Sequence, residues 1–475
     1  MAAMIAVYSC EKIGNDPVDP DKEPIPEKPE QESKPDTPSW PEDQQGKSYI
    51  WDSEVIPEVC IHISETNWNN ILTSHDRNRD LTPYLSCNIY FDKDGAKDTV
   101  KTAGVRIRDN ANGNRPEGAN GDSHSKKNAE WNLSNFEIDF DYFKEGRTLR
   151  NVKGILLRSC VNDPTFARER YCHDLFRKFG IWSIPHNTYC RLTIKVEGDA
   201  KPAYLGIYQM VEPVDQTYIN DRTNKFKGNQ GFLWKCSEGA FLRPGNIPVA
   251  ADNGKGESKM YLLMNNQDKL SSASAQLNDF ITKLNTLKDK TFKGWIVSVM
   301  DVKMFLRTYA VISTVGMYDD YWNTGNNYFL FFNSFSTDSY KVSFIPFDFE
   351  KSLGNNETKD STADPAVRDP YQWGRTTAPL MARLMQYEEF REVYTEALYE
   401  LTLPEAYLFN NADNIYIIRD LMYQVSDYTK NDTGTCMKPT DATAVWSTNK
   451  KYNLTQENEY NFFQVRSESI ISYIE

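Results

Sequence analysis

Two apolar runs in the third quarter of the chain follow the pattern of a β-hairpin. Residues 328–333 and 342–347 are rich in Phe, Tyr, Val and Ile, and a short polar loop at 334–341 separates them. Aromatic and β-branched runs on either side of such a loop predict two antiparallel strands. The start of the first strand then lies beside the end of the second. Asn327 and Asp348 are therefore expected to be neighbours at the open end of the hairpin.

The same kind of pattern divides the rest of the chain into a strand-rich first part and a helix-rich second part. Strands are expected at 59–63, 85–91, 99–108, 135–140, 188–196 and 203–211, the last two as a hairpin around Gly198-Asp199. Helices are expected at 65–74, 165–179, 301–317, 380–385, 388–401, 412–426 and 461–474. An α+β fold in two parts, joined near 212–300 with a cleft between them, fits this order.

The boundaries of one helix are predicted from its flanking residues. Asp163 is a good N-cap, and Pro164 is favoured at the first helical position. Gly180 is a common helix terminator. The helix at 165–179 is therefore expected to begin directly after this pair.

Polar and acidic residues gather at the expected open end of the hairpin. Asn327 precedes the first strand, Asp348 follows the second, and Asp319 and Asp320 lie just upstream. Carboxylate and amide oxygens at one point suit Mg²⁺, and a loop carboxylate beside them suits the base of a phosphoryl transfer. Protein kinases carry these residue types in the same order. The alternative is that these residues only form turns, because Asp and Asn side chains bond their own backbone there.

Cations that could hold phosphate groups occur in three places of the first half. Lys126 and Lys127 lie in a polar region, Arg108 ends the expected strand at 99–108, and Arg168 lies in the expected helix at 165–179. Phosphoryl transfer needs positive groups on the phosphates. The alternative for each is an ordinary solvent-exposed charge. Glu212 follows an apolar run and by itself indicates only the end of a strand.

Charge and motif content argue against several classes of function. The formal net charge is −13, and a negative chain is a poor partner for nucleic acid, whose phosphates must be neutralised by Lys and Arg. None of the eight cysteines forms a Cys-x-x-Cys pair and no His-Glu-x-x-His occurs, so a zinc site is not expected. The scattered cysteines are expected to be buried apolar residues. The P-loop motif and the Gly-x-Gly-x-x-Gly loop of protein kinases are also missing.

The first 47 residues predict an export signal followed by a tether. Residues 1–10 are apolar and end at Cys10, as at the end of a bacterial lipoprotein signal peptide; the alternative is a short disordered terminus. Residues 11–47 hold eight prolines and eleven acids against five lysines, which is typical of an extended acidic tether. A single domain is expected at 48–475. The chain is thus expected to be an extracytoplasmic lipoprotein at the cell surface or outer membrane, with membrane contact only through its lipid anchor.

These pieces, in this order, resemble the CotH kinase family, atypical kinases first known from bacterial spore coats. Four blocks carry the resemblance: 104–110 (Gly-Val-Arg-Ile-Arg-Asp-Asn), 163–168 (Asp-Pro-Thr-Phe-Ala-Arg), 205–215 (Leu-Gly-Ile-Tyr-Gln-Met-Val-Glu-Pro-Val-Asp), and 327–331 with 345–354 (Asn-Tyr-Phe-Leu-Phe and Ile-Pro-Phe-Asp-Phe-Glu-Lys-Ser-Leu-Gly). The third and fourth are the specific ones, and the resemblance runs from about residue 48 to the C-terminus. It implies a two-lobed, atypical protein-kinase-like fold that binds ATP and Mg²⁺ and phosphorylates Ser or Thr on secreted proteins.

Carried over by position, the resemblance implies roles at the open end of the hairpin. Asp348 would bind the metal, with Asn327 as the second ligand. Glu350 stands where the family has a second Asp and would be a longer ligand of the same charge. Asp320, or else Asp319, would be the base that accepts the proton of the substrate hydroxyl.

On the nucleotide side the resemblance implies roles for five more residues. Lys126 or Lys127 would hold the phosphates, and Arg108 and Arg168 would line the nucleotide pocket. Glu212 would mark the segment between the lobes.

Three further departures from the expected pattern leave open the possibility that the chain is a catalytically inactive member of the family. Asp109 replaces a Gly and puts negative charge where phosphates should lie. Phe347 replaces a Trp before the metal-binding Asp. The step from Asp320 to Asn327 is seven residues, longer than the five of the protein-kinase motif.

The expected function is therefore an exported ATP- and Mg²⁺-dependent kinase that acts on Ser or Thr of a secreted or surface protein. One alternative is a catalytically inactive, kinase-like surface module that binds a glycan or a protein, since the chain is rich in Trp and Tyr. A weaker alternative is a glycoside hydrolase, which would need an acid and a base at a defined separation.

Overall fold

The computed structural model describes most of the chain from residue 45 onward. The described residues are 45–79, 82–108, 114–125, 130–245, 247–252, 259–355, 364–409, 413–433, 439, 444–446 and 450–475. The expected signal segment with Cys10, the expected tether up to residue 44, and Lys126 and Lys127 lie outside these residues. The helix α1 (Gln45–Trp51) includes the last three residues of the expected tether.

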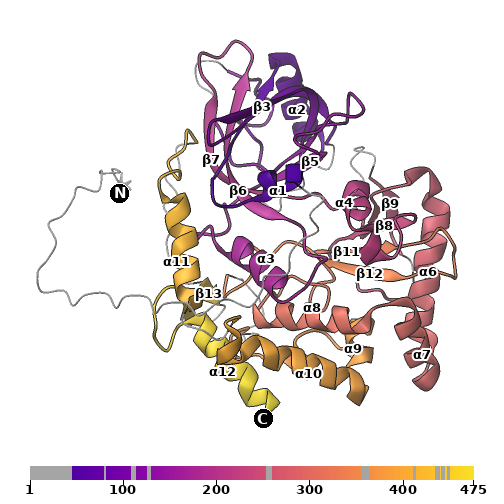
Figure 1. The fold of residues 1–475 in the computed structure, drawn as a ribbon. Coiled ribbons are helices and arrows are strands. Elements are labelled where there is room, and N and C mark those ends of the chain that lie inside the picture. Colours follow the sequence, from indigo (N-terminus) through magenta and orange to yellow (C-terminus); the bar gives the residue numbers. More distant parts are fainter. Residues whose placement is uncertain are drawn as a thin grey trace, which may run out of the picture.

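The first half of the chain forms a closed β-barrel, drawn in indigo to magenta in Figure 1. Its strands are β1 (Glu58–Ile63), β2 (Leu85–Lys93), β3 (Ala96–Ile107), β4 (Phe136–Asp139), β5 (Gly154–Ser159), β6 (Asn187–Val196) and β7 (Ala203–Val211). They follow the order β1-β2-β3-β4-β5-β7-β6, and a parallel pairing of β6 with β1 closes the barrel. In β1 the alternate residues Val59, Ile61 and Ile63 are buried. This period of two is the sequence signal that predicted the strand.

The predicted hairpin is confirmed, but it is part of a larger sheet. Its strands β11 (Tyr328–Phe332) and β12 (Val342–Pro346) are antiparallel. On its other side β11 pairs with β8 (Phe232–Cys236), which continues to β10 (Tyr261–Leu263) and β9 (Val249–Ala251). No element was predicted between 212 and 300, so the sequence analysis missed these three strands. The strand β11 lies between β12 and β8, and all five of its residues are buried.

Helices gather around this second sheet and form most of the C-terminal half (Figure 1). They are α4 (Gln216–Asp221), α5 (Thr223–Phe226), α6 (Leu270–Thr286), α7 (Asp289–Val299), α8 (Val302–Thr314), α9 (Pro379–Leu384), α10 (Glu388–Thr402), α11 (Asp413–Ser426) and α12 (Phe462–Ile474), with a small hairpin of β13 (Ala444–Trp446) and β14 (Lys450–Tyr452). The predicted helices of this half are all present. Asp301 caps α8, because its carboxylate accepts a hydrogen bond from the Met304 amide at 3.0 Å.

The helix predicted at 165–179 begins later than expected. The helix α3 runs over Arg168–Lys178. Asp163 does not cap a helix at Thr165. Its carboxylate instead closes a turn by accepting the backbone N–H groups of Thr165 at 3.0 Å and Arg168 at 2.9 Å. Phe166 has a φ of +63°, which a helix does not allow, so the predicted start was wrong by three residues.

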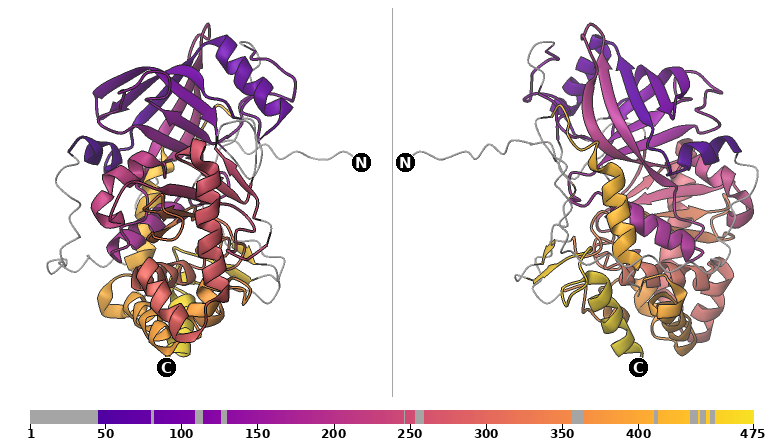
Figure 2. Two further views of the ribbon diagram at one scale, coloured as in Figure 1. Left: turned by 90° about the vertical axis from the view of Figure 1, so that its right-hand side faces the viewer. Right: turned by 60° about the vertical axis from the view of Figure 1, so that its left-hand side comes forward.

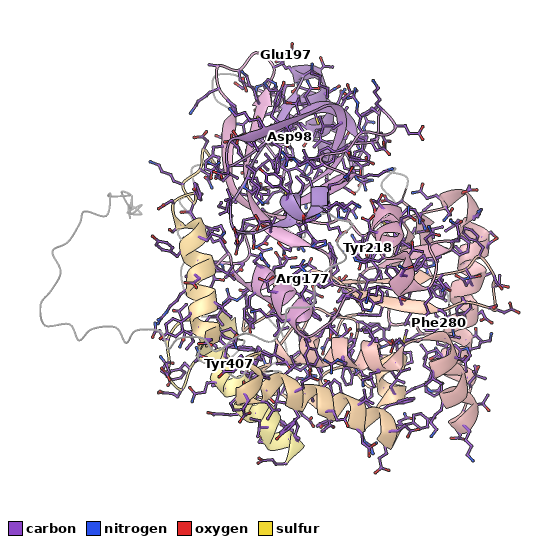
Figure 3. The ribbon with its side chains drawn as sticks, viewed as in Figure 1. Asp98, Arg177, Glu197, Tyr218, Phe280 and Tyr407 are labelled. Atoms are coloured by element: carbon purple, nitrogen blue, oxygen red, sulfur yellow. The ribbon has the colours of Figure 1, made fainter. Side chains whose placement is uncertain are left out.

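Several contacts join the barrel to the helical part. The last residues of α11 approach the barrel (Figure 2), and its Val425 lies in one buried apolar cluster with Ile207 of β7. After α11, Asp432 and Tyr204 exchange two hydrogen bonds of 2.8 and 3.0 Å. Arg177 of α3, labelled in Figure 3, donates to the Pro185 carbonyl at 2.8 Å. The predicted mixed α and β fold, with a strand-rich first part and a helix-rich second part, is confirmed.

The described cysteines and helices bear on two further predictions. All six described cysteines are free, five of them buried and Cys60 half-buried, as predicted. Among the described helices, none combines the length and the apolar character needed to cross a bilayer.

A buried histidine ties the barrel's polar segment 114–125 to the β6–β7 turn. The Nδ1 atom of His124 lies 2.9 Å from both oxygens of Glu117, and its Nε2 atom lies 3.0 Å from Asp199. The His124 side chain has no exposed surface. Burial alone would lower the pKa of His124, but the hydrogen bonds to the two carboxylates outweigh burial and raise it. The folded state therefore favours the imidazolium form.

This arrangement predicts that stability depends on the charge of His124. Because the folded-state pKa lies above the unfolded value of 6.5, the stabilising contribution is complete below pH 6.5 and is lost as pH rises through the folded-state pKa. The free energy of unfolding, measured with urea between pH 5.5 and 8.5, should fall less steeply in His124→Gln than in the wild type. His62→Gln is the matched control, because His62 forms no ion pair with any residue that the structure describes. Equal pH dependence of the wild type and His124→Gln would contradict the assignment.

Candidate functional site

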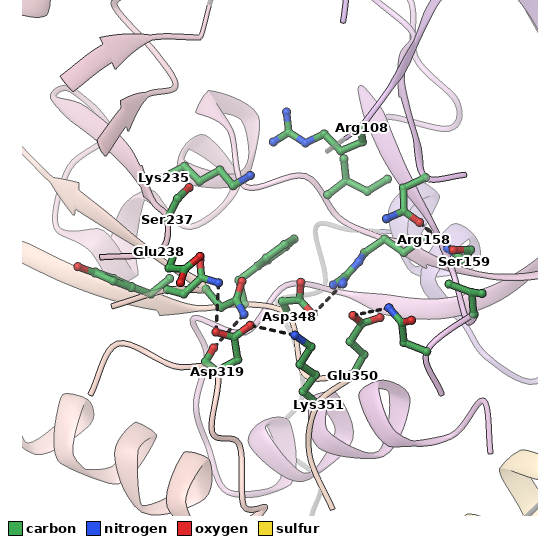
Figure 4. Close-up of a pocket in the computed structure, with 18 of the residues that line it drawn as sticks. Arg108, Arg158, Ser159, Lys235, Ser237, Glu238, Asp319, Asp348, Glu350 and Lys351 are labelled. Carbon is green, nitrogen blue, oxygen red and sulfur yellow. Dashed lines mark hydrogen bonds and ion pairs between the residues drawn. The ribbon is translucent and has the colours of Figure 1, made fainter. Parts of the chain in front are cut away.

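A polar cavity of about 300 Å³ is lined from one side by the barrel and from the other by the second sheet and the segments around it (Figure 4). Its charged lining residues are Arg108, Arg158, Lys235, Glu238, Asp319, Asp348, Glu350 and Lys351. Positive and negative groups are thus present in equal number. A cavity of this composition suits a ligand that carries negative charge and needs acidic side chains as well.

The open end of the hairpin lies in this cavity, as the sequence predicted. Asn327 and Asp348 both line it, and the Asn327 carbonyl accepts a hydrogen bond from the Phe347 amide at 3.1 Å. Asn327 has a φ of +58° and Asp348 a φ of +62°, a left-handed backbone that Asn and Asp adopt more readily than other side chains. The Asn327 amide nitrogen donates to the Asp319 carbonyl at 2.9 Å. The predicted neighbourhood of Asn327 and Asp348 is confirmed.

Arg158 links this site to the barrel and to α3, and sequence reasoning missed it. It lies on β5, where one guanidinium nitrogen is 2.7 Å from Asp348 and another is 2.6 Å from Glu169 of α3. The guanidinium also lies over the Phe347 ring. Burial alone would lower the pKa of Arg158, but the neighbouring carboxylates, Asp348 foremost, raise it. A signal was present in the sequence, because Arg158 is the one charged residue in the apolar run 154–159.

Glu350 supplies a further carboxylate near Asp348. Its side chain accepts a hydrogen bond from Asn162 at 3.1 Å. Burial, followed by the negative charge of Asp348, raises the pKa of Glu350 to about 7. The negative charge of these two carboxylates would stabilise a cation placed between them.

The donor set fits a hard cation such as Mg²⁺ in its chemistry. Asp348, Asn327 and Glu350 offer only oxygen atoms, which Mg²⁺ prefers, and Mg²⁺ commonly completes its shell with waters and phosphate oxygens. In the described part of the chain, no group of three or more His, Cys, Asp or Glu side chains is arranged to hold a metal ion. The set here has two carboxylates and one amide, and Asp348 is paired with Arg158. A cation would therefore have to share or replace that ion pair.

The structure distinguishes the two candidate base residues. Asp319 lines the cavity; one of its carboxylate oxygens accepts from Thr324 at 2.8 Å, and the other lies 3.6 Å from the Lys351 ammonium. Asp320 is buried and does not line the cavity; its carboxylate accepts the backbone and side-chain N–H groups of Asn323 at 2.7 and 3.0 Å. Burial raises the pKa of Asp320 to about 7. Of the two, only Asp319 can reach a ligand in the cavity.

The residues proposed for the nucleotide side are dispersed. Arg108 lines the cavity and lies 3.1 Å from Glu137. Arg168 is buried in an ion pair of 2.6 Å with Asp163, away from the cavity. Its pairing partner comes from the same turn, so Arg168 stabilises the start of α3.

Glu212 is also absent from the lining of this cavity. Two nitrogens of Arg222 lie 2.9 and 2.6 Å from its carboxylate. Burial alone would raise the pKa of Glu212, but Arg222 and His186 outweigh burial and lower it to about 2. This buried pair lies at the end of β7, where the chain leaves the barrel.

Two lysines in the cavity were not predicted. Lys235 comes from β8, in the region where no strand was expected, and Lys351 follows the hairpin. In Figure 4 the side chains of Lys235 and Arg108 reach into the cavity from its two sides. Lys235 is the single charged residue of the apolar run 232–236, which is the same signal as for Arg158.

Comparison with known proteins places the chain in a family. The family model described as "CotH kinase protein" matches residues 118–470. Three of the four sequence blocks lie inside this range. The first block, at 104–110, precedes it, so the match is narrower than the expected range from residue 48.

Two curated relatives also match parts of the chain. Inner spore coat protein H of Bacillus subtilis (strain 168) is 27% identical over 262 residues, which is 54% of this chain and 64% of that protein. Spore coat protein homolog 1 of Rhizopus delemar is 26% identical over 275 residues, 56% of this chain and 41% of that protein. The chain thus spans less than two thirds of either relative. Since the family match covers most of its length, the chain belongs to the CotH kinase protein family.

Proposed function

We propose that this chain is an ATP- and Mg²⁺-dependent kinase that transfers the γ-phosphoryl group to a Ser or Thr hydroxyl of another protein. The observation that carries the proposal is the meeting of Asp319, Asn327 and Asp348 in one cavity with Arg and Lys side chains. Membership of the CotH family supports a kinase-related function. The proposal includes a two-lobed kinase-like arrangement in which the barrel and the helical part are the lobes.

Asp348, Asn327 and Glu350 are the residues that would hold Mg²⁺. When bound, Mg²⁺ would neutralise phosphate charge that builds up during transfer. Arg158 keeps Asp348 oriented through its ion pair, and its second contact to Glu169 holds the guanidinium in place when Asp348 turns to a ligand. Arg108 and Lys235 reach the cavity and would attract the phosphate groups. Lys126 and Lys127 remain candidates for the same role.

Asp319 is the proposed base. It would accept the proton of the attacking hydroxyl, and Lys351 and Thr324 hold its carboxylate in position. Asp320 would instead have a structural role, because the hydrogen bonds that it accepts from Asn323 fix the turn that carries Asp319 toward the cavity.

Substitution of the two aspartates separates these roles. Asp319→Asn should lower phosphoryl transfer by about 10²–10⁴-fold, the usual contribution of a general base. Asp320→Asn should retain most of the transfer, since an amide oxygen can still accept from Asn323. Incorporation of label from [γ-³²P]ATP into dephosphorylated casein and into the chain itself measures both. Loss of transfer in Asp320→Asn with activity retained in Asp319→Asn would reverse the assignment.

The proposed location and acceptor rest on the relatives and the N-terminal sequence. The names of both relatives associate them with spore coats. We propose that this chain also acts outside the cytoplasm. It would be held by a lipid anchor at Cys10 and would phosphorylate a secreted or surface protein. Globomycin treatment of cells that express the full chain should leave an uncleaved, larger precursor if Cys10 is lipidated; an unchanged mass would contradict the anchor.

A catalytically inactive module is the second candidate. The Arg158–Asp348 ion pair supports it, because the principal metal ligand is already neutralised. Such a module would bind a surface glycan or a protein. If the chain binds ATP but the transfer assay yields no labelled product, this candidate is supported over the kinase.

A further inference from the structure

A second groove, of about 560 Å³, lies at the other end of the hairpin from the candidate active site. Residues 341–343, at the start of β12, line it, whereas Asp348 follows the end of the same strand. Its apolar lining includes the buried Phe226 and Phe390 and the half-buried Trp182. An open groove with an apolar lining on the outside of the molecule is a candidate binding surface for a peptide.

Four exposed lysines surround this apolar lining, although the chain as a whole is strongly negative. They are Lys225, Lys227, Lys303 and Lys341. Lys225, Lys227 and Lys303 make no ion pair with any residue that the structure describes, and Lys341 donates to the Ser298 carbonyl.

The two acids of the groove are already engaged. Asp301 caps α8, and Glu389 pairs with Lys293. The groove therefore combines unneutralised positive charge with an apolar lining in which Trp182 is the partly exposed aromatic ring. A segment that fits it has to be acidic and able to pack on apolar surface.

The N-terminal segment of this same chain has both properties. Residues 11–44 contain eleven acids, four lysines and eight prolines. Pro35, Pro38 and Pro41 are spaced by three residues, so in a polyproline II helix they share one face. Pro-x-x-Pro segments bind aromatic-lined grooves in this conformation. Acidic residues flank the prolines at Asp36 and Glu42, where they can meet lysines.

The segment also joins the described chain close to the groove. Lys47 of α1 forms an ion pair with Asp221, the last residue of α4. The next helix, α5, leads directly to Lys225, Phe226 and Lys227 at the edge of the groove. The ten residues 35–44, which directly precede α1, can extend over at most about 33–36 Å.

We propose that residues 35–43 bind in this groove, with the three prolines on its apolar lining around Trp182 and the acids beside the lysines. The bound segment would cover the start of β12 and shorten the free length between Cys10 and the folded part. This inference is independent of the proposed kinase activity, because it concerns neither the cavity nor its residues.

Zero-length carbodiimide cross-linking of the full chain at low ionic strength tests the contact. Peptide mass spectrometry should find Asp36, Glu42 or Asp43 joined to Lys225, Lys227 or Lys303. Lys97 and Lys201, whose side chains are 77% and 80% exposed, are the internal controls for random encounters. Links to these two lysines in equal yield, or no link to the groove lysines, would overturn the proposal.

A proline variant distinguishes docking from charge attraction alone. Replacing Pro35, Pro38 and Pro41 by Ala keeps every carboxylate and lysine, yet the yield of groove cross-links should fall several-fold. The matched control replaces Pro17, Pro20 and Pro24 by Ala and should leave the yield unchanged. An unchanged yield in the first variant would overturn docking through the proline face.

Discussion

Asp348→Asn is expected to bind ATP in the presence of Mg²⁺ at least about 100-fold more weakly than the wild type, since even the outer partners of a metal ligand contribute 10- to 100-fold. The substitution removes a charge and leaves the shape. Asn adopts the left-handed backbone of this position, where φ is +62°, and its amide oxygen can still accept from Arg158. Titration with a fluorescent ATP analogue at fixed Mg²⁺ measures the change.

The control for this experiment lies on the same hairpin. Asp338 is exposed in the loop between β11 and β12 and accepts a hydrogen bond from Ser336 at 2.9 Å. Asp338→Asn should bind the analogue like the wild type. Unchanged binding in Asp348→Asn, or an equal loss in both variants, would contradict the metal assignment.

Arg158→Met is expected to lower the free energy of unfolding by about 3–5 kcal/mol, as breaking a buried ion pair usually does. The substitution leaves the carboxylates of Glu169 and Asp348 without their shared cation. Burial, aided by neighbouring acids, already raises the pKa of Glu169 to about 7 although Arg158 opposes this. Urea unfolding at pH 7 measures the loss.

Two comparisons separate this effect from the loss of any arginine. Arg150 pairs with Asp98 at 2.8 Å on the barrel surface, and its side chain is 34% exposed. Arg150→Met should cost less than about 1 kcal/mol. Glu169→Gln added to Arg158→Met should recover part of the stability, because it removes one of the two stranded charges. Equal losses for Arg150→Met and Arg158→Met, or no recovery, would contradict the bridging role.

The positions of Asn327 and Asp348 could be predicted, because the pairing of two neighbouring strands determines them. Asn327 and Asp348 are joined by one hairpin, and hairpin geometry alone brings their positions together. Their placement needed no knowledge of the barrel. The choice between Asp319 and Asp320 was different, because it depends on which way a turn presents each side chain. The hydrogen bonds from Asn323 to Asp320 decide this, and although they are local, the residue pattern does not say which of two adjacent carboxylates accepts them.

Two of the missed residues, Arg158 and Lys235, come from elements far away in the sequence. Arg158 reaches Asp348 only because β5 and the hairpin lie on facing sides of the cavity. Lys235 depends on β8, a strand that was not predicted. In both cases a single charge in an apolar strand was the available signal. Such a residue is usually paired or functional when buried.

Errors also arose where a charged residue had a local partner. Arg168 was expected at the nucleotide, but Asp163, five residues earlier, pairs with it and delays the start of α3. The closure of the barrel could not be predicted from the sequence pattern either. It requires β6 to pair in parallel with β1, more than a hundred residues away, and alternation predicts strands without their partners.

The most direct test of the central claim is the melting temperature of the full chain with and without ATP and Mg²⁺. A ligand that binds only the folded state stabilises it, by about 2.7 kcal/mol at one hundred times its dissociation constant. The account predicts a rise that requires both ATP and Mg²⁺ and that is absent in Asp348→Asn. No rise in the wild type at millimolar ATP and Mg²⁺ would contradict a nucleotide site in this cavity.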